Sequence, residues 1–166
     1  MGVAGCGKSA VAEGLAAALG WRFVEGDRLH PPENIARMAN GRPLTDDDRA
    51  GWLDAVGDAL AAARAEGSGV VAACSALKRR YRDRLRRGCP DILFLHLVVD
   101  PETARRRVGG RVGHFMPPSL IDSQFADLEP PSVDERAAPL DGEGPLAETV
   151  AAAMAALDRI RPAIGG

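Results

Sequence analysis

The sequence predicts an α/β domain built on a parallel β-sheet. A glycine-rich loop at residues 2–9 leads directly into a helical pattern, and short apolar runs then alternate with helical patterns along the chain. Strands that alternate with helices are typical of parallel sheets with helices on their faces. With 166 residues the chain has the length of one domain with a hydrophobic core. We therefore interpret residues 1–166 as a single domain.

The loop GVAGCGKS matches the pattern G-x-x-x-x-G-K-[ST], known as Walker A. In such loops backbone N–H groups surround nucleotide phosphates, a lysine neutralises their charge and a hydroxyl reaches Mg²⁺. The pattern predicts an ATP and Mg²⁺ site in which Lys8 acts in catalysis and Ser9 binds the metal. The predicted nucleotide-binding residues are Gly2, Val3, Ala4, Gly5, Cys6, Gly7, Lys8 and Ser9.

Helices and strands follow the loop in a regular order. The first helix ends at Gly20, and WRFVEGD is a short strand that ends near Asp27. A short helix is expected at residues 35–38. Thr45 is the expected N-cap of a longer helix that stops near Gly67, because three aspartates occupy its first turn.

The second half continues the alternation. GVVAACSAL and DILFLHLVVD are almost uninterrupted apolar runs, as expected of parallel strands covered on both faces. A helix is expected between them at residues 78–87, and another begins at Asp100-Pro101. A helix at about residues 119–128, a short strand at AAPLDG and a terminal helix from Pro145 complete the order.

Ligands of parallel sheets bind at the carboxyl ends of the strands. The segments there are the loop, Asp27, residues 75–78 and the basic stretch after Asp100, so we expect them to converge on one cleft. Two interpretations of Asp27 are open. Its carboxylate takes the acceptor's hydroxyl proton or holds Mg²⁺ through water, or it only ends a strand or caps the next turn.

The basic stretch RRRVGGRVGHFM is broken by glycines. Arg107 and Arg111 are four residues apart and share a face of any helical path. We interpret the stretch as a movable flap that closes over ATP and sets these two guanidinium groups on the transferred phosphate. A solvated surface is the better interpretation of Arg105 and Arg106.

Three further residues are candidates for the site or have a simpler structural interpretation. Lys78 follows an apolar strand and is a candidate ligand for an anionic substrate, whereas the arginines next to it suit the surface. His114 contacts substrate or phosphate, or is a hydrogen-bonded histidine of the flap. Arg49 follows three aspartates, so an ion pair within its own helix is the simple interpretation.

Composition argues against several classes of function. The net charge of −2 and the lack of aromatic side chains beside the basic runs argue against a nucleic-acid partner. The apolar runs are too short to span a membrane. Three cysteines without a C-x-x-C spacing indicate free thiols in a reducing cytosol, and the scattered histidines do not have zinc-ligand spacing.

Four stretches of the sequence resemble the small P-loop gluconokinases, which are related to shikimate and nucleoside-monophosphate kinases. They are GVAGCGKSAVA, EGDRLHPPENIARMANGRPLTDDDRAGWL, ACSALKRRYRDRLR and RVGHFMPPSLIDSQFADLEPP. Many kinases share the first, whereas the second and fourth are particular to the gluconokinase group. The resemblance implies a three-layer P-loop kinase fold with a mobile lid at residues 104–130 and a substrate-binding segment at residues 27–60.

The resemblance also implies an activity, the transfer of the ATP γ-phosphate to the 6-hydroxyl of D-gluconate. Asp27 would be the base, and Arg107 and Arg111 would be the lid arginines. Family members are generally cytosolic and often homodimeric. The residues expected near the sugar-acid pocket are Asp27, His30, Arg49, Lys78 and His114.

One departure from the family concerns the first strand. Relatives carry apolar residues before the loop that form a central strand, whereas this chain begins at the loop. Without that strand we expect two rows of unpaired backbone groups and a weakly held phosphate loop. We therefore expect the strand to be encoded upstream of Met1.

Two other functions remain open at this point. One is a kinase for a different small hydroxy acid such as shikimate, which a panel of substrates distinguishes. The other is a nucleotide-binding chain without catalysis because its first strand is missing. Such a chain would release no ADP with any acceptor.

Overall fold

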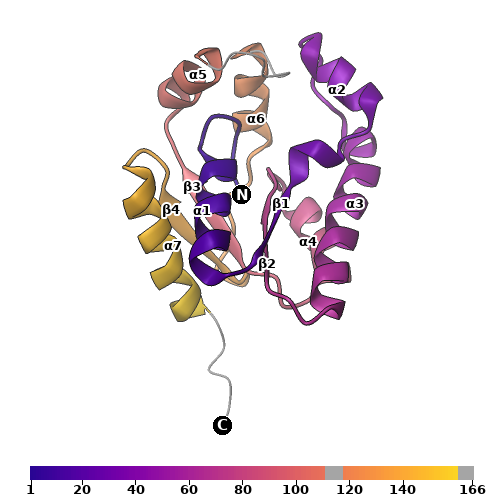
Figure 1. Cartoon of the computed structure of the whole chain (residues 1–166). Coiled ribbons are helices and arrows are strands. Elements are labelled where there is room, and N and C mark those ends of the chain that lie inside the picture. The colour runs from indigo at the N-terminus through magenta and orange to yellow at the C-terminus, as the bar shows by residue number, and fades with distance from the viewer. Residues whose placement is uncertain (111–117, 161–166) are drawn as a thin grey trace.

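The computed structural model describes residues 1–110 and 118–160. Helices and strands alternate along them, as predicted (Figure 1). The α-helices are α1 Lys8–Leu19, α2 Pro32–Ala39, α3 Asp46–Ala65, α4 Arg79–Gly88, α5 Pro101–Gly109, α6 Ile121–Asp127 and α7 Leu146–Ile160. The strands are β1 Arg22–Glu25, β2 Val70–Ala73, β3 Phe94–Val98 and β4 Ala137–Asp141, and 3-10 turns lie at η1 Gly26–Leu29 and η2 Pro118–Leu120.

Capping residues set the helix ends where the sequence indicates them. Gly20 ends α1 in the left-handed conformation, at φ 66°. Thr45 and Asp48 form a reciprocal capping box at the start of α3. The Asp100 carboxylate accepts from the backbone N–H of Thr103 at 2.7 Å and starts α5. These three predicted helix ends are therefore confirmed.

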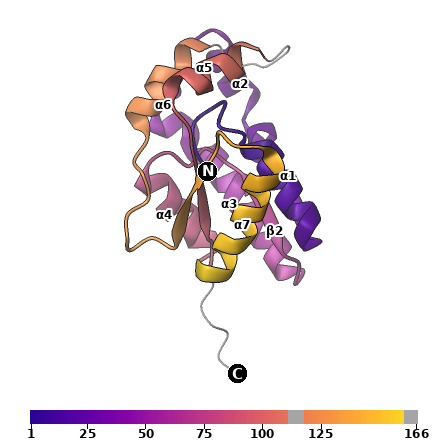
Figure 2. The same ribbon diagram turned by 90° about the vertical axis from the view of Figure 1, so that its left-hand side faces the viewer.

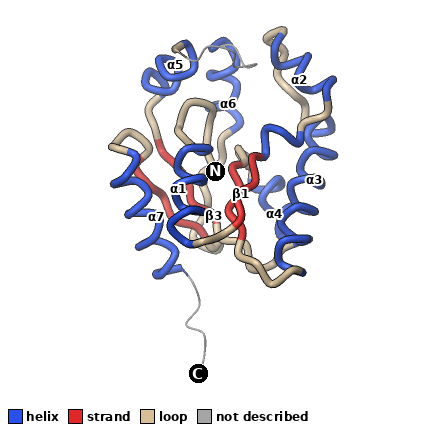
Figure 3. Tube along the Cα trace, viewed as in Figure 1, coloured by secondary structure: helices blue, strands red, loops and turns tan. Residues whose placement is uncertain are grey.

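The strands form two parallel pairs, β1 with β2 and β3 with β4, and not one four-stranded sheet. In register, Arg22 lies opposite Val70 and Phe94 opposite Ala137. The N-terminus lies between the two pairs (Figure 3). The predicted parallel α/β fold is confirmed, with the described strands in two separate pairs.

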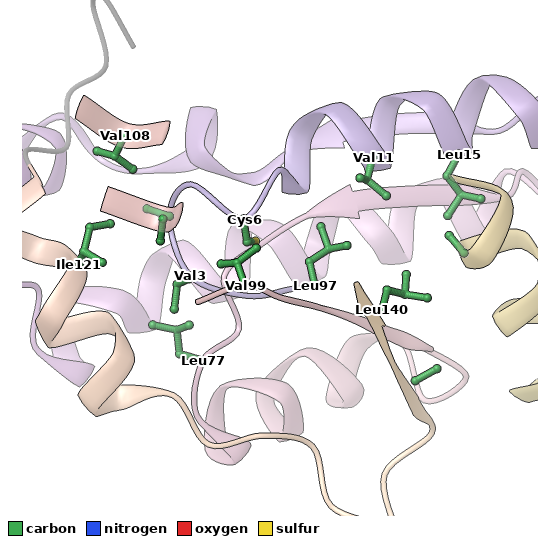
Figure 4. Close-up of a cluster of buried hydrophobic side chains, with 14 of the residues drawn as sticks. Val3, Cys6, Val11, Leu15, Leu77, Leu97, Val99, Val108, Ile121 and Leu140 are labelled. Carbon is green, nitrogen blue, oxygen red and sulfur yellow. The ribbon is translucent and has the colours of Figure 1, made fainter. Parts of the chain in front are cut away.

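Helices cover both sides of the strands and make three layers (Figures 1 and 2). Helices α1 and α7 share one hydrophobic core with β3 and β4, and helices α3 and α4 form a second core with β2. The phosphate loop belongs to the first core, because Val3 and Cys6 are 2% and 1% exposed beside Leu97 and Val99 (Figure 4). Cys6 therefore packs as a small buried residue.

The three cysteines are free thiols, as predicted. Burial raises the pKa of Cys74 to about 11 and also raises the pKa of Cys89, so neither is a reactive thiolate at neutral pH. Within the described part of the chain, no helix combines the length and the apolar character that crossing a membrane requires.

Candidate active site

Three glycines shape the phosphate loop, with φ of 137° at Gly2, 82° at Gly5 and 95° at Gly7. A Cβ at Gly5 would lie 2.5 Å from the carbonyl oxygen of Ala104, so α5 approaches the loop as closely as only glycine permits. Gly7 is the N-cap of α1 and offers no capping side chain. The first N–H groups of α1 can therefore bind an anion.

Hydrogen bonds connect the first residues of the loop to distant segments, and another closes the loop on itself. The N–H of Gly2 donates to the carbonyl oxygen of Ser75 at 3.1 Å, and the N–H of Ala4 donates to Gln124 Oε1 at 2.7 Å. Lys8 Nζ donates to the carbonyl oxygen of Val3 at 2.9 Å, within the curve of the loop. Residues from distant parts of the sequence therefore contact the loop, and the expectation of a weakly held loop remains a prediction.

One small cavity joins the loop to the segments that follow β1 and β2. Its lining residues are Ala4, Gly5, Gly7, Lys8, Ser9, Asp27, His30, Met38, Arg49, Ser75 and Gln124. The loop, Asp27, His30 and Arg49 thus line one cavity, and their roles in binding remain predictions. Lys78 and Arg107 do not line this cavity.

His30 lies against Trp52, whose ring is stacked on it at 4.2 Å with an interplanar angle of 13°. The indole Nε1 of Trp52 donates to the carbonyl oxygen of Gly26 at 2.7 Å, which fixes the ring. His30 is 7% exposed, and its Nδ1 is buried without a hydrogen-bond partner among the described residues. Burial lowers the pKa of His30 to about 4, so at neutral pH the imidazole is neutral and presents one unsatisfied nitrogen.

Arg49 is 5% exposed, and its Nε is also buried without a partner in the described structure. The aspartates before it bind elsewhere, Asp46 to Lys78 and Asp48 to Arg37. The ion pair within its own helix is therefore not found in the described part of the chain. The guanidinium carbon lies 5.9 Å from the ring centroid of Tyr81. A buried cation that lines the cavity and whose Nε has no hydrogen-bond partner in the described structure is suited to an anionic ligand.

Lys78 connects two helices. Its ammonium group pairs with Asp46 at 3.1 Å and with Asp127 at 2.9 Å, and the side chain is 16% exposed. Burial lowers its pKa, but hydrogen bonds to the two aspartates outweigh this and raise the pKa above its usual value. In this structure Lys78 ties α3 to α6 and does not contact the cavity.

Arg107 packs behind the phosphate loop. Its guanidinium donates to the carbonyl oxygens of Gly142 at 2.7 Å and Gly5 at 3.5 Å, which joins the loop to the turn after β4. Arg111 and His114 lie outside the described residues, as does the middle of the predicted lid at residues 104–130. The lid functions predicted for these residues remain predictions.

Sequence reasoning missed several residues of the site. Gln124 was recognised only as part of a helix, yet its side chain accepts from Ala4, 120 positions away. Trp52 belongs to the apolar side of a helix in the sequence pattern, and that pattern does not reveal that its ring stacks on His30. No local signal identifies either role, because each depends on a contact between distant segments.

The donor set of the cavity suits Mg²⁺. Ser9 and Asp27 both line it and supply a hydroxyl and a carboxylate, which are the oxygen ligands that Mg²⁺ prefers. In residues 1–110 and 118–160, no three His, Cys, Asp or Glu side chains gather into a metal cage. A cation held by one or two protein oxygens together with nucleotide phosphates fits this arrangement.

Comparison with known proteins identifies the family. A family model described as an AAA domain matches residues 1–131. The gluconokinase of Gluconobacter oxydans (strain 621H) is 50% identical over 143 residues, which cover 86% of this chain and 80% of the relative. The chain belongs to the gluconokinase family. The resemblance seen in the sequence is therefore confirmed.

Solved structures agree with this assignment to the gluconokinase family. The crystal structure of a gluconokinase from Sinorhizobium meliloti 1021 is 48% identical, with a TM-score of 0.86 over 96% of this chain and 90% of that one. A shikimate kinase from Aquifex aeolicus has a TM-score of 0.67 over 100% of this chain and 97% of that one, at 16% identity. The second likeness shows the fold alone, and together they confirm the predicted P-loop kinase fold.

Proposed function

We propose that this chain transfers the γ-phosphoryl group of ATP to D-gluconate and yields 6-phospho-D-gluconate. The observation that carries the proposal is a cavity lined by the phosphate loop, by a neutral histidine and by an arginine whose Nε has no hydrogen-bond partner in the described structure. D-gluconate has the matching chemistry, with one carboxylate and several hydroxyls. The membership of the gluconokinase family supports the same substrate.

On the nucleotide side, the residues of the loop act mainly through their backbone. The loop N–H groups and Lys8 would bind the β- and γ-phosphates, and Ser9 would hold Mg²⁺, which would neutralise charge on the phosphate oxygens. Asp27 lines the same cavity and would accept the proton of the attacking hydroxyl. A bond forms between that oxygen and phosphorus as the bond to the ADP oxygen breaks.

On the acceptor side, side chains do the binding. Arg49 pairs with the carboxylate of gluconate, and the free Nδ1 of His30 bonds a hydroxyl. Lys78 acts through its two aspartates, by fixing the start of α3 relative to α6. For Lys78 to contact the substrate directly, its ammonium group would have to break its ion pair with Asp46 or with Asp127.

The lid arginines complete this proposal. Arg111 and His114 are proposed to reach the phosphates or the acceptor when the lid closes. For Arg107 to reach the transferred phosphate, its guanidinium must leave the carbonyl oxygens of Gly142 and Gly5. Its present contacts support a different contribution, the positioning of the phosphate loop.

The cellular compartment and the oligomeric state are proposed from fewer observations than the activity. Three free thiols suit a reducing cytoplasm, which is where we propose the enzyme works. A homodimer is proposed from the family resemblance alone.

The test is release of ADP with Mg²⁺ and ATP, measured with D-gluconate, shikimate and other sugar acids in turn. We expect kcat/KM to be highest for D-gluconate and to fall at least about a hundredfold in the variant Lys8→Ala. A higher kcat/KM for another acid would replace gluconate as the substrate. Nucleotide binding without turnover on any acid would favour the non-catalytic alternative.

A further inference from the structure

The carboxylate three positions before Arg49 is bound to another helix. Asp46 and Arg49 both lie on α3, at a spacing that lets oppositely charged side chains of one helix pair. Asp46 pairs instead with Lys78 and Arg80 at the start of α4. The Nε of Arg49 has no hydrogen-bond partner among the described residues. The question is what keeps these two neighbours on α3 apart.

Three donors occupy both oxygens of the Asp46 carboxylate. Oδ1 accepts from the hydroxyl of Tyr81 and from Lys78 Nζ, the latter at 3.1 Å. Oδ2 pairs with the guanidinium of Arg80. The hydrogen bond from Tyr81 is the main cause that lowers the pKa of Asp46, so this group is ionised at neutral pH. A carboxylate held in this way is not available to Arg49.

Tyr81 is the residue that contacts both members of the missing pair. Its hydroxyl donates to Asp46, and the guanidinium carbon of Arg49 lies 5.9 Å from the centroid of its ring. The side chain is 3% exposed and packs in the core between α3 and α4. Burial and the bond to Asp46 raise the pKa of Tyr81 to about 12, so the hydroxyl keeps its proton and remains a donor.

Three cations surround the ring of Tyr81, and two of them share one carboxylate. Lys78 Nζ lies 5.7 Å and the guanidinium carbon of Arg80 5.8 Å from the ring centroid, and both pair with Asp46. Arg49 is the third cation, and it lines the cavity beside the phosphate loop. Because Asp46 is occupied, a carboxylate of a ligand does not compete with it for Arg49.

We propose that Tyr81 is a positioning residue of the acceptor site, because it holds Asp46 away from Arg49 and keeps the Arg49 guanidinium open to the carboxylate of the acid substrate. This inference rests on the proposed function, in which Arg49 binds that carboxylate. Without the Tyr81 hydroxyl, Oδ1 of Asp46 loses one of its two donors, and Asp46 turns to form the ion pair that its spacing to Arg49 favours. The acid must then displace Asp46 before it binds.

The first measurement follows Arg49 without any substrate. Its Nε–H signal in nitrogen-15 NMR spectra is identified by its loss in Arg49→Met. In Tyr81→Phe, which keeps the ring, we expect this signal to move, because the guanidinium gains a carboxylate. In a chain that already carries Asp46→Asn, the same change at Tyr81 should leave the signal in place. An unmoved signal in Tyr81→Phe alone would overturn the proposal.

The second measurement is the KM of the enzyme for each substrate. We expect KM for D-gluconate to rise about fivefold in Tyr81→Phe, with kcat and KM for ATP unchanged, because an ion pair of moderate strength competes with the acid. In the Asp46→Asn chain, the change at Tyr81 should alter this KM less than about twofold. In an Asp47→Asn chain it should again raise KM about fivefold. Asp47 is the matched control, since it is an acidic residue of the same first turn of α3.

The comparison of the three chains separates positioning from packing. A tyrosine that only filled the core would have the same effect whatever residue stood at position 46. An equal rise in KM in all three chains would therefore overturn the proposal. A moved NMR signal with an unchanged KM would confirm that Tyr81 holds Asp46 but would reject the binding of gluconate by Arg49. If another acid proved to be the substrate, the KM measurement would use that acid, and the NMR measurement would be the same.

Discussion

The two halves of the active-site cavity use different parts of the chain for recognition. The nucleotide half is a backbone structure in which three glycines with positive φ form a cradle at the start of α1. The acceptor half consists of side chains, with His30 and Arg49 buried and each holding one nitrogen without a partner in the described structure. In the proposed function, a nucleotide triphosphate would bind to the first half alone. Selection of one acid among many requires the second half, because unpaired buried groups penalise a ligand that does not satisfy them.

The largest expected effect lies in the nucleotide half. In Gly5→Ala, the added Cβ would meet the Ala104 carbonyl oxygen, and φ of 82° is unfavourable for alanine. We expect kcat/KM to fall about a hundredfold with every acceptor, because a displaced loop misaligns the phosphate. Steady-state kinetics on D-gluconate and on any slower acid measure this.

The matched control for that change is Gly51→Ala. Gly51 lies inside α3, and nothing described lies within 4 Å of a Cβ built there. Stability should rise by about 0.5–1 kcal/mol, with activity unchanged. An equal loss of activity in both variants would show that the close approach of the loop to α5 has no special role.

A change in the acceptor half should lower kcat/KM for gluconate without changing KM for ATP. In Arg49→Met the buried cation is lost, and a lost charged hydrogen bond of about 1.5–3 kcal/mol corresponds to about 10–100-fold in kcat/KM for gluconate. KM for ATP should stay unchanged. Arg37→Met is the control, since Arg37 is an exposed arginine that pairs with Asp48. A rise in KM for ATP in the Arg49 variant would contradict the division of the cavity.

A smaller effect is expected at His30. Phenylalanine at this position keeps the stacking on Trp52 and removes the free Nδ1. We expect kcat/KM for gluconate to fall about tenfold in His30→Phe, with the loss of one hydrogen bond, and stability to be kept. His30→Ala should lose both activity and stability. If the phenylalanine variant were fully active, Nδ1 would have no part in binding.

The last expected effect is on stability and not on activity, and it is a dependence of stability on pH. Burial lowers the pKa of His30 and of His96 to about 4, from about 6.5 in the unfolded chain. Between these values the unfolded chain binds protons that the folded chain does not, so the free energy of unfolding rises as pH increases from 4 to 6.5. Denaturation by urea at several pH values measures the slope. His30→Phe should remove about half of it, and an unchanged slope would assign it to other groups.

Much of the fold and part of the site were predictable from local patterns. The caps at Gly20, Thr45 and Asp100 each act within a few residues, and the structure confirms all three. The position of Asp27 beside the loop also follows from strand order. Arg49 was harder, because its neighbouring aspartates suggested a local pair and only the structure shows that they bind Lys78 and Arg37.

The sequence by itself determined the phosphate loop, the order of helices and strands and the kinase family, because these depend on short-range spacing and on long motifs. Only the tertiary structure decided which polar groups remain unpaired in the cavity, how Gln124 and Ser75 hold the loop, and where the strands separate around Met1. Such features depend on contacts between segments far apart in the chain. The burial and the hydrogen bonds of each of these residues are set by residues far away in the sequence, and local patterns do not reveal such partners.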